Sequence, residues 1–211
     1  MSILVIDMMT SRTRLACGDD YIEYPETRDQ AELLPHHIES IIKQADCTYQ
    51  NLRGIVAITG PGSFTGLRVA LSSAHALGLS LNIPVVGVSA DEAFALTLGT
   101  DKDVALILDT RRKDFAVALK KKNEANFSAF QEFDEDGITN IINGHFICGN
   151  GAIKAGLAVD QQDIDLVKLA QNINIHDGEY NPNTAQPLYL RPPDVTMSSQ
   201  KFEHQKASSI D

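Results

Sequence analysis

Two stretches of the chain show the same order of apolar and polar positions. LVIDMMTSRTRLACG (4–18) and LILDTRRKDFAVALK (106–120) each contain an apolar run that ends in aspartate, a polar turn and a second apolar run. This order is typical of a β-hairpin. A third strand-like run follows in each half, from Tyr21 and from Asn126. The pattern predicts two related units of three strands, one in each half of the chain.

A gap-free alignment of the two stretches places Asp7 on Asp109 and Leu15 on Val117. The shared aspartate and the matching order favour an internal duplication, although short apolar runs also align by chance. A chain of this length has room for two such lobes.

Between the two units, the pattern changes to helices and buried strands. Apolar residues at helical spacing predict a helix over about 30–46. The apolar runs 54–59 and 85–89 are continuous, which is typical of buried strands, and the segment 66–81 between them predicts a second helix. The order strand, helix, strand implies parallel pairing through a right-handed crossover.

Shorter patterns complete the chain. We expect a helix over 91–99, a strand with a glycine turn over 145–152 and a helix over 163–171. Beyond Asn172, repeated prolines keep a polar segment mostly extended. Its stretch PLYLRPPD (187–194) is interpreted as a structural strap.

Composition and charge narrow the function classes. The net charge of the 211 residues is −10, and an acidic surface repels nucleic-acid phosphates, so contact with RNA needs a partner that supplies positive charge. No apolar run approaches the roughly 20 residues that cross a bilayer, and the N-terminal sequence shows no basic leader. The three cysteines lack CxxC spacing and are expected to be reduced thiols. We therefore expect a cytoplasmic protein without membrane contact.

The loop GPGSFTG (60–66) leads into the second helix and looks like a place to hold a phosphate. Its spacing does not fit: a P-loop needs a lysine that is absent, and Thr65 stands where the dinucleotide-binding pattern and the nucleophile elbow need glycine. A tight turn followed by a helix cap from Ser63 or Thr65 explains the same residues. The loop is therefore predicted to position the helix, through Gly60, Pro61, Gly62, Ser63, Thr65 and Gly66.

Both longer helices carry a stripe of apolar or small side chains. Ala70, Ala74 and Gly78 lie four apart, a spacing that lets another helix approach closely. The stripes fit either the chain's own core or a face for a second protein, and the pattern leaves both interpretations open. The candidate interface residues are Leu34, Ile38, Ile41, Ile42, Leu67, Ala70, Leu71, Ala74, Leu77, Gly78 and Leu81.

The stretch GPGSFTGLRVAL (60–71) closely resembles the signature of the TsaB (YeaZ) family, bacterial proteins needed to make threonylcarbamoyladenosine on tRNA. The resemblance covers most of residues 3–195, and further stretches agree in place and order: ILVID (3–7), LLPHHI (33–38), PVVGVSADEAFA (84–95), LILDTRRKDF (106–115), CGNGA (148–152) and PLYLRPPDV (187–195).

This resemblance implies a fold. It is the two-lobed α/β fold of the actin, sugar-kinase and heat-shock-protein superfamily, which is ribonuclease H-like. Each lobe is expected to hold a mixed sheet of three antiparallel and two parallel strands. We expect the lobes at 1–103 and 104–195, with a weakly ordered tail at 196–211.

The resemblance also implies a function. TsaB-like proteins are noncatalytic partners of TsaD, which transfers the threonylcarbamoyl group to adenosine 37 of tRNAs that read codons beginning with A. The ATPase TsaE joins them in a larger complex. TsaB-like proteins pair with TsaD, or with themselves, through helices of the N-terminal lobe, here about 30–46 and 66–81. The expectation is a scaffold subunit without a cofactor, which meets tRNA only through the complex.

The alternative function is that of a nucleotide-dependent enzyme, such as a small-molecule kinase or hydrolase, with its site in a cleft between the lobes. In nucleotide-using relatives, the first hairpin turn carries an aspartate that helps to hold the metal, and small residues after it contact phosphate. Asp7 and Thr10 remain here as a vestigial nucleotide site, but Met8 and Met9 follow the aspartate and crowd a phosphate. No histidine pair has the spacing of a metal site.

Overall fold

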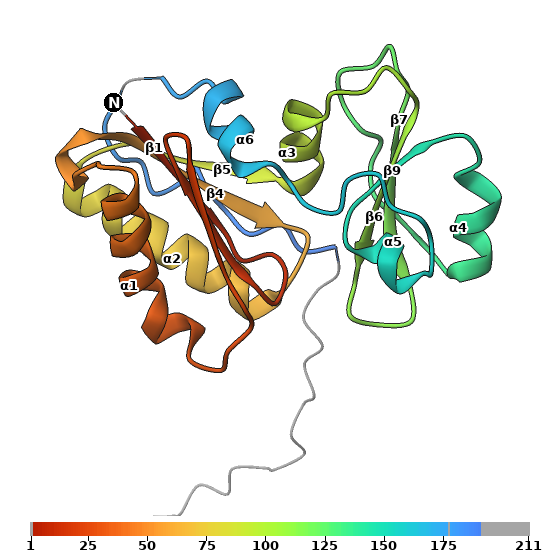
Figure 1. Ribbon diagram of the computed structural model, residues 1–211, viewed down its shortest axis with the longest axis horizontal. Helices are drawn as coiled ribbons and strands as arrows, with labels where there is room; N and C mark the ends of the chain where they lie inside the picture. Colours follow the sequence, from red (N-terminus) through yellow and green to blue (C-terminus); the bar gives the residue numbers. More distant parts are fainter. Residues whose placement is uncertain (1, 177, 191–211) are drawn as a thin grey trace, which may run out of the picture.

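The first half of the chain builds a five-stranded mixed sheet (Figure 1). The structure, a computed structural model, describes residues 2–176 and 178–190; the expected tail at 196–211 lies outside these ranges. The order β3-β2-β1-β4-β5 joins three antiparallel strands to two parallel ones, as expected. The strands are β1 (Ser2–Asp7), β2 (Thr13–Cys17), β3 (Asp20–Tyr24), β4 (Leu52–Gly60) and β5 (Val85–Ser89).

Helices cover both faces of this sheet because its central strands are apolar on both sides. Along β1, Leu4 and Ile6 face one helix layer, whereas Ile3 and Val5 face the other. A short 3-10 helix, η1 (Tyr49–Asn51), precedes β4. The first layer consists of α1 (Gln30–Gln44) and α2 (Phe64–Leu81), and the second of α3 (Ala90–Thr97) and α6 (Leu166–Asn172). The sequence pattern predicted all four helices, and their bounds differ by only a few residues.

The second half builds a smaller sheet in the order β8-β7-β6-β9. The expectation of five strands is wrong here: in the described part of the chain, β9 is followed only by an isolated bridge between Cys148 and Gln161. The sequence pattern also missed α4. The elements are β6 (Val104–Asp109), β7 (Phe115–Lys120), β8 (Gln131–Phe133), α4 (Glu135–Ile141), β9 (Phe146–Cys148) and α5 (Gly151–Lys154).

The two hairpins share their topology, but their turns differ in length. Asp7 pairs with Arg14 across the first hairpin, whereas Asp109 pairs with Phe115 across the second. The first turn is therefore one residue longer, and the gap-free alignment is wrong by one position in the second strand. Because a shift of one residue exchanges the two faces of a strand, the duplicated hairpins match only when this extra residue is allowed for.

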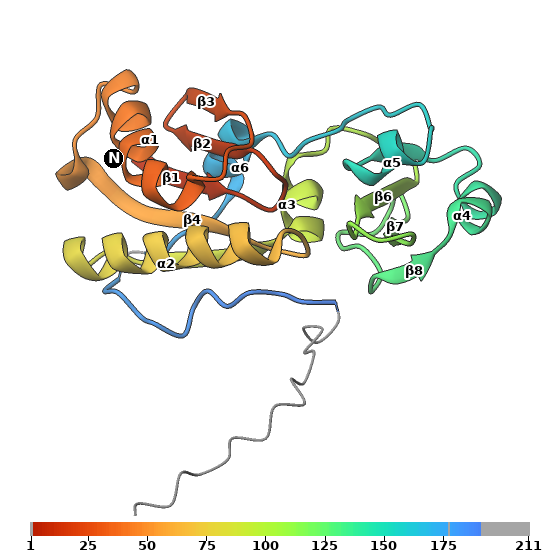
Figure 2. The same ribbon diagram turned by 90° about the horizontal axis from the view of Figure 1, so that it is seen from below.

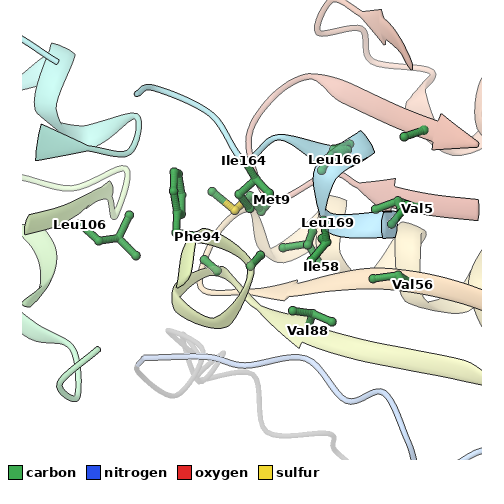
Figure 3. Packing of buried hydrophobic residues seen from close by; sticks show 14 of the residues in the cluster. Val5, Met9, Val56, Ile58, Val88, Phe94, Leu106, Ile164, Leu166 and Leu169 are labelled. Atoms are coloured by element: carbon green, nitrogen blue, oxygen red, sulfur yellow. The ribbon is translucent and has the colours of Figure 1, made fainter. Parts of the chain in front are cut away.

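After the second sheet, the chain returns to the first. Leu166 and Leu169 of α6 belong to the same buried cluster as Val5 and Ile58 of the first sheet (Figure 3). The following segment runs along α2 on the outside of the first lobe (Figure 2). Assignment of the whole range 104–195 to the second lobe is therefore wrong at α6, because the apolar side chains of α6 are buried against the first sheet.

One hydrophobic cluster joins the two lobes. Phe94 of α3 is fully buried and lies between Met9 of the first hairpin turn and Leu106 of β6 (Figure 3). The lobes therefore share an apolar contact at the same end of the first sheet where the glycine-rich loop begins.

Candidate functional site

The glycine-rich loop packs against the first hairpin turn. The amide of Ser63 donates to the carbonyl oxygen of Met9 at 2.7 Å, and the Ser63 hydroxyl accepts from the amide of Gly66 at 3.2 Å. Ser63, and not Thr65, is therefore the cap of α2. A Cβ atom at Gly62 would overlap with the carbonyl oxygen of Met9, and one at Gly66 with that of Met8. These glycines let two backbone segments touch, so the space next to them is filled by protein.

The side chains predicted to form a partner surface lie mostly in the chain's own core. A side chain without exposed surface cannot contact a second protein in this conformation, so their assignment to an interface is wrong. Only Leu77 and Leu81 of the predicted set remain partly exposed. The nine buried members are Leu34, Ile38, Ile41, Ile42, Leu67, Ala70, Leu71, Ala74 and Gly78. Binding of a partner through α1 and α2 stays a prediction, and residues outside this buried set would have to make the contacts.

The outer face of α2 is a different stripe of the same helix. Its exposed residues are Thr65, Arg68, Ser72, Ala76 and Leu79, which follow one another at intervals of three or four and therefore share one side. We call these five residues the α2 outer face. The side chains at the centre of this face are small, and Leu79 near its end is 66% exposed. Sequence reasoning missed this set because it followed the apolar stripe, which marks the buried side of a helix.

Charge also sets α2 apart. Arg68 is the only Asp, Glu, Lys or Arg in the 18 residues of this helix, although the chain as a whole carries a net charge of −10. Because α2 carries no acidic residue, less charge must be desolvated when another protein packs there. The absence of acidic residues from α2 was visible in the sequence and could have indicated this face.

Aromatic side chains hold the only charge of the α2 outer face. The guanidinium of Arg68 stacks over the ring of Phe64, 3.7 Å from its centroid, and its Nε donates to the hydroxyl of Tyr189 at 3.1 Å. The rings of Phe64 and Tyr189 lie 5.2 Å apart. Arg68 is therefore anchored at the start of α2 by stacking and one hydrogen bond, a geometry that favours arginine over lysine.

The segment before Tyr189 straps α2 to the sheet (Figure 2) and overlaps the predicted strap, 187–194, only at its C-terminal end. The amide of Leu188 donates to the carbonyl oxygen of Thr59 at 2.8 Å. The ring of His75 contacts the carbonyl oxygen of Ala185 through Nε2 at 2.9 Å and the hydroxyl of Tyr180 through Nδ1 at 3.2 Å. We call residues 180–189 the strap. Of the stretch 187–194 that the sequence analysis interprets as a strap, residues 191–194 lie outside the described residues.

Both carboxylate oxygens of Asp7, at the end of β1, are bound by other groups of the protein. Its Oδ1 accepts from the amide of Met9 at 2.8 Å, and its Oδ2 accepts from the guanidinium of Arg14. Burial alone would lower the pKa of Arg14, but the negative charges of Asp7 and Asp163 outweigh it and raise that pKa above its ordinary value. A permanently charged guanidinium thus occupies the position at which a cation could approach Asp7.

Arg14 also ties the hairpin to the segment before α6. Its Nη1 donates to the carbonyl oxygen of Ile164 at 3.3 Å and lies 3.4 Å from Asp163. Arg12 contacts Asp163 at 2.6 Å and Glu23 at 2.9 Å. This ion-pair network contributes to the contact between the first sheet and the returning chain.

A small polar pocket of about 190 Å³ lies between the lobes. Met9, Thr10, Ser11 and Glu26 line it from the first half of the chain, and Asp109, Arg111 and Asn150 line it from the second. Thr10 is thus at this pocket, whereas Asp7 is not among its lining residues, so the structure does not bring the two residues of the vestigial nucleotide site together here.

Asp109, the counterpart of Asp7, is also neutralised. Its Oδ1 accepts from the amide of Arg111 at 2.7 Å and from Lys154 Nζ at 2.6 Å. In both halves, therefore, the aspartate at the end of the first hairpin strand binds a backbone amide two residues later and a cationic side chain. Within residues 2–176 and 178–190, no group of three or more His, Cys, Asp and Glu side chains is arranged to hold a metal ion.

The helices that the structure describes include none with the length and apolar character needed to span a membrane.

Comparison with known sequences gives partial matches. A family model described as "TsaD: tRNA N6-adenosine threonylcarbamoyltransferase" matches residues 25–136, just over half of the chain. A Bacillus subtilis protein named "tRNA threonylcarbamoyladenosine biosynthesis protein TsaB" is 35% identical over 95 residues, which are 44% of this chain and 41% of that protein. An uncharacterized protein of Mycobacterium tuberculosis is 38% identical over 90 residues, 42% of this chain and 41% of its own length. The aligned part thus spans about two fifths of these relatives.

Comparison with solved structures extends the match along the chain. The structure described as "YeaZ from Pseudomonas aeruginosa" has a TM-score of 0.67 at 19% sequence identity, with 90% of this chain and 99% of that chain covered. A second Pseudomonas aeruginosa structure, described as similar to the peptidase YeaZ, has a TM-score of 0.68 at the same identity and coverage. This likeness confirms the predicted two-lobed, actin-like α/β fold. The chain therefore belongs to the family that the threonylcarbamoyltransferase model describes, and within it to the TsaB (YeaZ) proteins.

Proposed function

We propose that this chain is a noncatalytic subunit that binds a TsaD-like threonylcarbamoyltransferase and supports the formation of threonylcarbamoyladenosine at position 37 of tRNA. The α2 outer face carries this proposal. It is exposed, small at its centre and free of acidic residues, on a protein that is otherwise strongly acidic. The descriptions of the family model and of the Bacillus subtilis relative both concern this modification and support the same pathway.

The small centre of the α2 outer face fits a helix of a partner. Ser72 and Ala76 lie one turn apart, so the backbone of a second helix can approach closely above them. Phe64, which is 40% exposed, and Leu79 supply larger apolar contacts at the two ends. We further propose that a second copy of this chain uses the same face when the TsaD-like protein is absent, and that a TsaE-like ATPase joins the assembled pair.

The cleft supports a role without catalysis. The carboxylate of Asp7 is buried and bound by Arg14, and that of Asp109 is bound by Lys154. A divalent cation that carries a nucleotide needs carboxylate oxygens that are free to coordinate it, whereas both oxygens of Asp7 and one oxygen of Asp109, Oδ1, accept from protein donors. The alternative function, a nucleotide-dependent enzyme, rests on Thr10 and Ser11, two hydroxyl-bearing residues that line the polar pocket.

Co-purification with the TsaD homologue of the same organism tests the proposal. We expect Leu79→Glu and Ala76→Tyr to weaken capture of the TsaD homologue by about tenfold or more, because they place charge or bulk on the face that docks. Ile153→Glu is the matched control, since Ile153 is a 50% exposed apolar residue on α5 in the other lobe. Equal capture by Leu79→Glu and by the unchanged chain would overturn the assignment of this face.

An ATPase assay of the purified chain distinguishes the two functions. The scaffold function predicts no turnover above a buffer control. ATP turnover that is lost in Thr10→Ala, with an unchanged circular dichroism spectrum, would instead support the enzyme. In a reconstituted mixture, tRNA modification should require both proteins and should fall with Leu79→Glu in proportion to lost binding.

A further inference from the structure

Arg68, the only charged residue of α2, lies at an unfavourable place for a cation. It stands near the start of the helix, where the backbone carries a partial positive charge. Its contacts within the chain are with Phe64 and Tyr189, and neither of them is an acidic residue. The packing of small residues on the α2 outer face does not explain this charge either. The position of Arg68 therefore points to a negatively charged group outside the chain.

The contacts of Arg68 leave one edge of its guanidinium open. Its Cζ lies 3.7 Å from the centroid of the Phe64 ring, and its Nε donates to the Tyr189 hydroxyl at 3.1 Å. Among residues 2–176 and 178–190, Nη1 and Nη2 donate to no other group. These two nitrogens together present parallel N–H donors at the spacing of carboxylate oxygens. The open edge therefore fits a carboxylate, which it would bind through both oxygens.

The surroundings of Arg68 favour such a contact inside a complex. The Phe64 ring next to the guanidinium is exposed, and so is Leu190, which follows Tyr189. Ser72 lies one turn further along the α2 outer face, so a partner helix that packs along α2 over Ser72 also passes Arg68. Apolar side chains around an ion pair exclude water from it in the complex and so strengthen it.

We propose that Arg68 binds a carboxylate on the docking helix of the TsaD-like partner and thereby favours this partner over a second copy of the chain. This role of Arg68 rests on the proposed function and adds the chemistry by which the α2 outer face selects its partner. An acidic side chain at this place is stabilised both by the guanidinium and by the N-terminal end of α2. A nucleic-acid phosphate has the same sign of charge, but the net charge of −10 repels such a polyanion.

A second copy of the chain fits Arg68 less well. In a symmetric dimer that packs α2 against α2, both copies contribute the same residues. None of the 18 residues of α2 is acidic, so the facing helix offers no carboxylate and brings a second Arg68 to the interface. A charge that is desolvated without a partner, or next to a like charge, weakens binding. Arg68 should therefore oppose self-association while it supports binding of the TsaD-like protein.

Two binding measurements on Arg68→Gln test this selectivity. We expect capture of the TsaD homologue to weaken by about tenfold or more, and self-association, measured by analytical ultracentrifugation, to stay unchanged or to increase. A merely structural role of Arg68 would weaken both, as Leu79→Glu should. Capture by the unchanged chain should also fall more steeply with salt than capture by Arg68→Gln. Lys113→Gln is the charge-matched control, because it removes an exposed cation between β6 and β7 in the other lobe, and it should change neither measurement.

A carbodiimide cross-link tests the chemistry of the partner group directly. The reagent joins amines to carboxylates, and α2 of the unchanged chain has neither a lysine nor an acidic residue, so this helix gives no cross-link. Arg68→Lys places an amine at the same position. We expect the reagent to join this amine to an aspartate or glutamate of the TsaD homologue as an amide, with the loss of one water, and peptide mapping by mass spectrometry to identify that residue.

The outcomes separate the role of Arg68 from the proposed function. Weaker capture by Leu79→Glu but not by Arg68→Gln would overturn the role of Arg68 and leave the docking face in place, whereas unchanged capture by both would overturn both. Equal losses of capture and self-association in Arg68→Gln would also overturn this role, as would Arg68→Lys that captures the homologue without a cross-link from α2. Unchanged capture with weaker tRNA binding by the complex would assign Arg68 to a phosphate instead.

Discussion

Arg14 of β2 donates to the buried carboxylate of Asp7, which stands directly opposite it in the first hairpin. Both side chains are only 1% exposed. The carboxylate at the end of the first strand is therefore paired within the protein. Of the two methionines after the aspartate, Met8 is fully buried in the core, whereas Met9, which is 5% exposed, also lines the polar pocket between the lobes.

Loss of Arg14 should destabilise the chain strongly. Arg14→Met leaves the Asp7 carboxylate buried without its partner, which typically costs about 3–5 kcal/mol. Arg12→Met is the matched control, because the ion pairs of Arg12 are partly exposed and should contribute about 1 kcal/mol or less. Urea unfolding monitored by circular dichroism measures the stability of both variants. Circular dichroism is chosen because the sequence has no tryptophan for a fluorescence signal. Equal midpoints for the two variants would contradict the importance of the buried pair.

Helical spacing and apolar runs predicted the elements of the first lobe well, because these patterns report which side of an element is buried. The same patterns could not identify the α2 outer face. An apolar stripe marks the buried side of a helix and does not indicate which exposed side binds a partner. The pairing of Asp7 with Arg14 depends on a hairpin turn that is one residue longer than its duplicate. Such a difference in register is not indicated by any pattern in the local sequence. The packing of α6 on the first sheet likewise depends on contacts between residues far apart in the sequence, which the periodicity of apolar residues does not indicate.

The glycine-rich loop should be intolerant of the smallest side chain. In Gly66→Ala, the new Cβ would overlap with the carbonyl oxygen of Met8, and backbone cannot move aside as a flexible side chain can. We expect a loss of about 1–3 kcal/mol in the free energy of unfolding. Gly99→Ala is the control, because its Cβ would meet only the end of the Lys168 side chain, at 3.6 Å. A Gly66→Ala variant as stable as Gly99→Ala would show that the loop does not press on the hairpin turn.

The strap should depend on Tyr180. Its ring packs beside Gly78 and meets His75 edge-on, with centroids 5.8 Å apart. Tyr180→Phe removes the hydrogen bond to His75 and should cost about 1 kcal/mol, whereas Tyr180→Ala also removes the packing and should cost about 2 kcal/mol. Limited proteolysis should then cut the strap faster in the order Tyr180→Ala, Tyr180→Phe, unchanged chain. Identical cleavage rates would mean that backbone hydrogen bonds alone hold the strap.

Stability should fall between about pH 7 and pH 5 because of His37. Its ring stacks on Tyr24, with centroids 3.5 Å apart and planes 7° from parallel, and its Nδ1 is buried without a hydrogen-bond partner in the part of the chain that the structure describes. In the charged ring both nitrogens carry a proton, so the N–H group at Nδ1 would have no acceptor among the described groups. Burial, assisted by the neighbouring His36, accordingly lowers the pKa of His37 below its ordinary value of 6.5.

The sign of this effect follows from proton linkage. Because the folded-state pKa is the lower one, the unfolded chain binds the proton first as the pH falls, and the free energy of unfolding decreases below about pH 6.5. The carboxylates whose pKa values are lowered, such as that of Glu23, titrate below this window. His37→Phe keeps a ring stacked on Tyr24 but cannot bind a proton, so its urea midpoint should change less between pH 7 and pH 5 than that of the unchanged chain. His176→Gln, which replaces an exposed histidine, should keep the full slope. If His37→Phe and His176→Gln show the same slope, His37 does not control stability in this range.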